Sequence, residues 1–114
     1  MNTNNVAASL GDVTARTLTG TPRIELGRIL ATPGALAYLA NHRVDPLHLV
    51  QLHQQGKCGA LDQEDVAANN RALIDGGRIF SSYIIGGDKV WVITEAVDDA
   101  GSRNSTTVLL PSEY

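Results

Sequence analysis

The chain has 114 residues, of which 43% are hydrophobic and 18% charged, the size and composition of one small globular domain. Its nine Lys and Arg residues are scattered between Arg16 and Arg103, and twelve acidic residues give a formal net charge of -3. A protein that grips a nucleic-acid backbone usually carries clustered cations, because each phosphate contact needs a positive charge. The charge pattern therefore argues against general binding of DNA or RNA.

The sequence carries no membrane or export signal. No apolar run approaches the ~20 residues of a membrane-spanning helix, so we expect no membrane partner. The first residues have neither the basic start nor the apolar stretch of a secretory signal. A single cysteine, Cys58, excludes a disulfide within the chain. These features predict a cytoplasmic protein, and nothing in the sequence indicates an oligomeric state.

Residues 1 to 20 are rich in Asn, Thr, Ser and Gly and show no lasting periodicity, which predicts a disordered, mobile arm. Residues 21 to 114 then form a predicted single domain. Its first element is a short strand in residues 23 to 30. There, Ile24, Leu26 and Leu30 alternate on one face, and Ile29 falls on the other.

Three helices follow, each with a recognisable start. Thr32-Pro33 and Asp45-Pro46 each place a capping side chain before a proline at the first helical position. They predict helices from Pro33 to about Asn41 and from Pro46 to about Gln55. Asp62, with an acid three residues later, predicts a third helix that ends at Gly76-Gly77.

After Gly77 the apolar period changes to two, which predicts strands in residues 78–85, 89–96 and 105–111. Gly86-Gly87 is a strong hairpin signal, because the favoured hairpin turns need positive φ. Both faces of these strands are half apolar, so we expect one face to pack on the helices and the other to be partly covered or offered to a partner. The order β-α-α-α-β-β-β predicts an α+β fold, with about three helices packed on a three- to four-stranded, mostly antiparallel sheet.

Metal and cofactor sites are not indicated. His42, His48 and His53 are spaced by six and five residues, whereas a helical zinc pair needs a spacing of three or four. We interpret them as surface or helix-end residues. Cys58 has no protease or transferase signature around it, and we interpret it as a small buried or half-buried residue. The chain has no phosphate-binding glycine loop, so we expect no metal and no cofactor.

One hypothesis is a small metal-independent ribonuclease. Cleaving RNA through its own 2′-hydroxyl needs a general acid and base with cations or hydroxyls around the phosphate. His53 is the candidate acid/base, Arg78 the phosphate ligand, and Tyr83 or Thr107 the hydroxyl donor. Helices followed by an antiparallel sheet resemble the general architecture of barnase-, EndoU- and RelE-type ribonucleases, although fold does not fix function. The acidic net charge argues against an RNA substrate.

The other hypothesis is a module that binds a protein partner. The half-apolar sheet face would dock on the partner, and exposed acids would face a basic surface. The candidate acids lie on the third helix and in the last turn: Asp62, Glu64, Asp65, Asp75, Asp98 and Asp99. The alternative is that most of these acids only form a solvated surface.

A family resemblance bears on this choice. It is carried by Gly59-Ala60-Leu61, Glu64-Asp65, Asn69, Ala72-Leu73, Arg78, Ser82-Tyr83, residues 91–96, residues 106–111 with Tyr114, and, near the start, residues 31–36. On these residues the chain resembles a family of short, plasmid-related proteins of bacterial plasmids and integrated mobile elements. Where that family has Gly-Asp-Trp-Gly, this chain has Gly56-Lys57-Cys58-Gly59, so a role for that turn is not carried over.

The resemblance implies a bacterial mobile element as the setting and no particular activity. The sequence lacks catalytic signatures and is acidic. Together these observations predict a non-enzymatic accessory protein that binds a protein partner, in host defence or in replication. The ribonuclease is the alternative, and only under it would nucleic acid be a partner.

Overall fold

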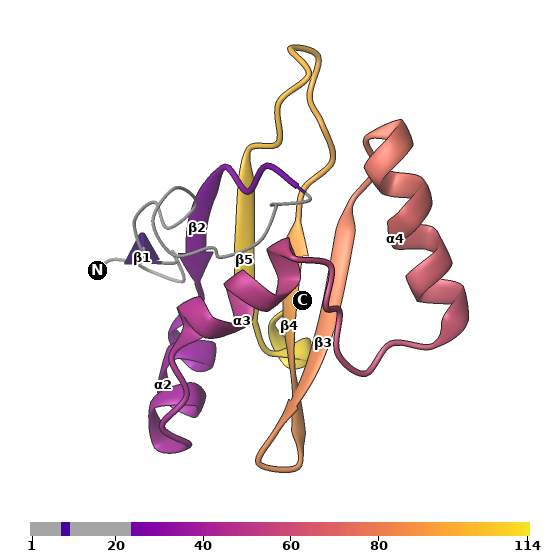
Figure 1. The fold of residues 1–114 in the computed structure, drawn as a ribbon. Coiled ribbons are helices and arrows are strands. Elements are labelled where there is room, and N and C mark those ends of the chain that lie inside the picture. Colours follow the sequence, from indigo (N-terminus) through magenta and orange to yellow (C-terminus); the bar gives the residue numbers. More distant parts are fainter. Residues whose placement is uncertain (1–7, 10–23) are drawn as a thin grey trace.

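The described residues form one mixed β-sheet and three α-helices (Figure 1). The computed structural model describes residues 8–9 and 24–114. In chain order the elements are β1 (Ala8–Ser9), β2 (Arg28–Ala31), α2 (Pro33–Asn41), α3 (Pro46–Gln54), α4 (Gln63–Asp75), β3 (Ile79–Ile85), β4 (Asp88–Thr94), β5 (Ser105–Leu109) and the 3-10 turn η1 (Pro111–Glu113). The strand order is β1-β2-β5-β4-β3, and only the β2–β5 pair is parallel. The predicted α+β class is confirmed. Of the predicted arm, only β1 lies within the described residues.

The helices begin where their capping residues predict. The Thr32 side chain accepts a hydrogen bond from the backbone N–H of Ala35 at 3.2 Å. Asp45 caps α3 and Asp62 caps α4 in the same way, which satisfies N–H groups that the first turn leaves unpaired. At the other end of α4, Gly76 takes the left-handed conformation that closes a helix.

Gly27 interrupts the alternation of side chains between the two faces of the first predicted strand. Its φ is +64°, and a Cβ there would lie 2.4 Å from the carbonyl oxygen of Arg103, so only glycine fits. The bend shortens the strand to Arg28–Ala31, and Ile29, rather than Leu30, faces the core with Ile24 and Leu26. The predicted facing of Leu30 was therefore wrong, because strict alternation does not survive a residue with positive φ.

The hydrophobic core lies between α2, α3 and one face of the sheet. Figure 1 shows α3 crossing this face, with α4 alongside β3. Most buried side chains of the core come from the four longer strands and from α2 and α3, among them Ile29, Ala31, Ala35, Leu39, Leu49, Val50, Ile79, Val90, Val92 and Val108. On the strands these residues alternate with others that point to the opposite face of the sheet. That opposite face carries the groove described below.

The β3 edge is closed by hydrogen bonds from α4 and the loop before it. The Asn69 side chain accepts from the Phe80 N–H at 2.9 Å and donates to the Phe80 carbonyl at 2.6 Å. The N–H of Ser82 donates to the Cys58 carbonyl, and the Ala60 N–H donates to the Ser82 carbonyl. The backbone N–H and carbonyl groups of Phe80 and Ser82 that point away from β4 are therefore paired within the chain. This prevents another strand from pairing with β3 at these two residues.

Candidate functional site

His53 occupies the centre of a buried polar network. It lies in the last turn of α3 with its side chain against the sheet, and it is 1% exposed. Nδ1 lies 2.6 Å from the hydroxyl of Ser81 on β3, and Nε2 lies 2.8 Å from that of Thr94 on β4. Of the interpretation of His53 as a surface or helix-end residue, the position at a helix end is confirmed and the exposure to solvent is wrong. Strand hydroxyls replace water as its hydrogen-bond partners.

The hydrogen bonds of this network run in one direction. The Thr106 hydroxyl donates to the Leu26 carbonyl at 2.8 Å, so at 2.6 Å it accepts from Thr94. Thr94 then accepts a hydrogen bond from the His53 Nε2–H, and His53 Nδ1 accepts a hydrogen bond from the Ser81 hydroxyl. Burial lowers the pKa of His53 to about 3. His53 is thus neutral, and both of its nitrogens are occupied within the protein.

The sheet separates the four residues of the ribonuclease hypothesis. His53 and Tyr83 lie on the helix-covered face, whereas Arg78 and Thr107 belong to the opposite face. The Tyr83 hydroxyl donates to the Lys57 carbonyl at 2.6 Å, and burial raises its pKa. The structure does not bring these residues together around one phosphate, so the geometry gives the ribonuclease hypothesis no support.

The candidate acids are exposed and form two groups. Asp62, Glu64 and Asp65 lie at the start of α4. Asp75 lies at its other end, where the Val97 N–H donates to the Gly76 carbonyl and brings the loop with Asp98 and Asp99 close. A helix of 13 residues separates the groups by about 20 Å. Three of the acids also have local roles, because Asp62 caps α4 and Asp75 and Asp98 accept backbone hydrogen bonds in turns.

A hollow of about 120 Å³ beside α3 brings His53 near Cys58 and Asn69. The nitrogens of His53 are occupied as described, and the Asn69 amide pairs with Phe80 and also donates to the Cys58 sulfur at 3.4 Å. This cluster stabilises the junction of α3, α4 and β3, and it presents no unengaged acid or base.

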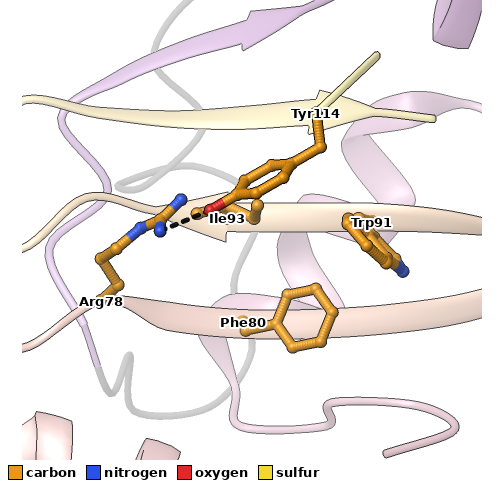
Figure 2. A pocket seen from close by; sticks show the side chains of 5 residues that line it. All are labelled: Arg78, Phe80, Trp91, Ile93 and Tyr114. Carbon is orange, nitrogen blue, oxygen red and sulfur yellow. Dashed lines mark hydrogen bonds between the residues drawn. The ribbon is translucent and has the colours of Figure 1, made fainter. Parts of the chain in front are cut away.

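The candidate functional site is a groove on the opposite face of the sheet (Figure 2). We call it the aromatic groove, and it is lined by Arg78, Phe80, Trp91, Ile93 and Tyr114. Phe80 meets Trp91 edge to face with ring centroids 5.1 Å apart, and Trp91 meets Tyr114 at 5.7 Å. Its volume is about 260 Å³. An open groove built from three aromatic rings is typical of a surface that binds another molecule.

Arg78 supplies the charge of the groove. Its Nη1 donates to the Tyr114 hydroxyl at 2.7 Å, as Figure 2 shows, and the guanidinium carbon lies 5.4 Å from the centroid of the Tyr114 ring. The hydrogen bond to Tyr114 raises the pKa of Arg78. Glu95 approaches Arg78 Nε at 3.7 Å, with both side chains about half exposed. The groove therefore combines apolar walls with a cation at one end.

The C-terminal turn places Tyr114 over the groove. After β5, the Glu113 carboxylate accepts hydrogen bonds from the Leu110 N–H and from the Thr32 hydroxyl at the start of α2. The strand pattern contains a signal for the rest of the groove, because the Gly86-Gly87 turn sets the register that places Phe80 opposite Ile93. Tyr114 has no such signal, since its position depends on a tertiary contact between Glu113 and Thr32.

No family model, curated protein or solved structure matches this chain. The resemblance to plasmid-borne proteins therefore stays a prediction. Of the helices that the structure describes, none has the length and apolar character needed to cross a membrane. Across residues 8–9 and 24–114, no three His, Cys, Asp or Glu side chains gather closely enough to hold a metal ion.

Proposed function

We propose that this chain is a non-enzymatic protein-binding module that docks on its partner through the aromatic groove. The observation that supports the proposal is the gathering of Phe80, Trp91 and Tyr114 on the sheet face opposite α2 and α3. Aromatic side chains are enriched in the buried centres of protein interfaces, because each buries a large area at a small entropic cost. The setting in a bacterial mobile element, in host defence or replication, belongs to the same proposal and rests on the resemblance alone.

The aromatic groove on the sheet face is a better candidate for the docking site than the β3 edge or the acidic residues. The β3 edge is closed at Phe80 and Ser82, so a partner cannot extend the sheet there. The candidate acids are divided between the two ends of α4 and form no single patch. The aromatic groove combines apolar contact area with a hollow into which a partner can insert a side chain.

The experiment is affinity capture from a bacterial lysate at low and high salt, with bound proteins identified by mass spectrometry. Bait proteins are the wild type, Trp91→Ser, Tyr114→Ala and the matched control Ile74→Ser. Ile74 is an apolar residue on α4 that is 90% exposed and outside the groove. Circular dichroism verifies that each variant is folded.

We expect a partner that the wild type and Ile74→Ser retain and that both groove variants lose. High salt should weaken this capture only modestly, because the contact is mainly apolar. If folded groove variants retain every protein that the wild type retains, the groove is not the docking site and the proposal fails. Capture that depends on nucleic acid and disappears with nuclease would also contradict it.

A further inference from the structure

We infer that the partner segment inserts one aliphatic or aromatic side chain into the aromatic groove and places a neighbouring carboxylate on Arg78. This inference rests on the proposed function and adds the chemistry of the bound segment. Its elements are the size of the hollow, the polarity of its walls and the state of the Arg78 guanidinium.

The hollow is smaller than a typical small-molecule pocket, which favours a single side chain as its occupant. Its volume of about 260 Å³ lies below the ~300–1,000 Å³ of typical small-molecule pockets. The floor and walls are the side chains of Ile93, Phe80 and Trp91, with the Tyr114 ring on the remaining side, as Figure 2 shows. Among these lining residues, the polar side-chain groups are the Arg78 guanidinium, the Tyr114 hydroxyl and the Trp91 indole N–H. Such walls favour an apolar side chain, because a polar group inserted between them would lose its hydrogen bonds to water.

Arg78 selects the neighbour of that side chain. A guanidinium has five N–H donors, and within the described residues this one makes a single hydrogen bond, to the Tyr114 hydroxyl. The 3.7 Å separation from Glu95 is longer than a hydrogen bond, and the Arg78 side chain is 46% exposed. Arg78 therefore keeps donors for a carboxylate from the partner, the group that a guanidinium recognises best among protein side chains.

The same features disfavour a nucleotide and a bare cation. A nucleotide could stack on the rings, but the chain is acidic overall and its nine cations are scattered, so the phosphates of a nucleic acid would meet no basic track beside the groove. An ammonium ligand would meet the positive charge of Arg78, which already lies beside the Tyr114 ring. A segment with an apolar residue followed by Asp or Glu matches both the walls and the charge.

Trp91 is the only tryptophan in the chain, so its fluorescence reports on the groove directly. The probes are four blocked peptides, acetyl-Gly-Ser-X-Z-Ser-Gly-amide, in which X-Z is Phe-Glu, Phe-Gln, Phe-Lys or Ala-Glu. Each is titrated into the full-length protein at low ionic strength. The variants are Arg78→Gln, Glu95→Gln and, as a charge-matched control, Arg71→Gln, which removes an exposed arginine on α4.

We expect the Phe-Glu peptide to bind about fivefold more tightly than Phe-Gln, the ratio expected for one half-exposed ion pair. Phe-Lys should bind more weakly than Phe-Gln, and Ala-Glu should leave Trp91 emission nearly unchanged. Arg78→Gln should remove the preference for Glu, whereas Arg71→Gln should retain it. Glu95→Gln should strengthen binding of Phe-Glu, because it removes the competing carboxylate.

Equal binding of the Glu and Gln peptides, or no response of Trp91 to any peptide, would overturn the inference. So would a stronger response to a single-stranded oligothymidine, or a concentration-dependent change in sedimentation of the protein alone that Trp91→Ser abolishes. The first of these would indicate a nucleic-acid site and the second a contact between copies of the chain. If a partner depends on Trp91 but the peptides show no preference for Glu, the proposed function survives and this inference fails. If the peptides show the preference for Glu but no protein captured from the lysate depends on Trp91, the proposed function fails and this inference survives.

Discussion

At the scale of single residues, two buried ionisable side chains, His53 and Arg103, are each held by several hydrogen bonds. His53 accepts from Ser81 and donates to Thr94, so its neutral form is satisfied, and burial disfavours its charged form. Arg103 is buried as a cation, and its guanidinium donates to the carbonyls of Gly77, Glu95 and Ala72. Both residues tie a helix to the sheet, and both make stability depend on one side chain.

Lowering the pH should destabilise the protein through His53. Its folded-state pKa of about 3 lies below the ordinary 6.5, so between these values the unfolded chain binds a proton that the folded chain excludes. Above about pH 6.5 His53 contributes no pH dependence, and below it the free energy of unfolding should fall by about 1.4 kcal/mol per pH unit until about pH 3. Urea denaturation across this range measures the slope, which His53→Gln should reduce and the exposed His48→Gln should leave unchanged.

If His53→Gln retains the wild-type dependence of unfolding free energy on pH, the assignment of a buried, neutral imidazole to His53 is wrong. Should that variant fail to fold, NMR of the wild type provides the same test. The Nε2 proton of His53 should then exchange slowly, and its ring signals should not titrate between about pH 7 and about pH 4. Titration near the ordinary pKa would contradict the prediction.

Replacing Arg103 by Met should cost about 2–4 kcal/mol of unfolding free energy, because the part-buried carbonyls of Gly77 and Glu95 lose their Arg103 donor and Ala72 O keeps only the Gly76 N–H. One of them, Ala72 O, lies in the last turn of α4, where a cation also compensates the helix dipole. The measurement is the urea midpoint, with the exposed Arg71→Met as the control. Equal midpoints for the two variants would show that Arg103 does not fix α4 to the sheet.

At the scale of elements, α4 closes the sheet edge more than it builds the core. Only Asn69 and Ala72 of this helix are buried, and Ile74 is 90% exposed to solvent. The Asn69 side chain imitates a neighbouring strand by pairing with both backbone groups of Phe80. One polar residue on a helix therefore replaces a strand, and its loss should expose the edge.

Asn69→Ala should lower the unfolding free energy by about 1–3 kcal/mol, because the outward N–H and carbonyl of Phe80 lose their partners. Hydrogen exchange of the Phe80 amide should accelerate, and the protein should aggregate at lower concentration. Asn70→Ala, next in sequence and exposed, is the control. Unchanged protection of Phe80 in a folded Asn69→Ala protein would refute the role assigned to this side chain.

The elements that the sequence predicts well are those defined by local chemistry. Thr32, Asp45 and Asp62 mark the helix starts, and the Gly86-Gly87 pair marks the hairpin, because each acts on backbone groups within a few residues. The parallel pairing of β2 with β5 joins segments about 77 positions apart, Arg28 with Ser105, and no local pattern encodes it. His53 combines a local and a tertiary feature. The sequence predicts its position in a helix, but its burial depends on hydroxyls from β3 and β4.

At the scale of the whole molecule, the two faces of the sheet have different covers. α2 and α3 seal one face with the hydrophobic core, and the C-terminal turn reaches over the other with one ring, Tyr114. Phe80, Trp91 and Ile93 are consistent with the predicted second half-apolar face, whereas the contribution of Tyr114 arises only once α2 and β5 are assembled. The groove is thus a property of the folded molecule and not of one segment.

Glu113→Ala should open the aromatic groove without unfolding the protein. The carboxylate holds the C-terminal turn through the Leu110 N–H and the Thr32 hydroxyl, both at exposed positions, so we expect a stability loss of about 1 kcal/mol or less. Tyr114, already 69% exposed, should then leave Trp91, whose emission should shift to longer wavelength and become more accessible to acrylamide. Glu64→Ala on α4 is the control and should leave quenching unchanged. A folded Glu113→Ala protein with wild-type quenching would show that Tyr114 is held over the groove by its own contacts with Trp91 and Arg78. Glu113 would then have no part in shaping the surface that we propose binds the partner.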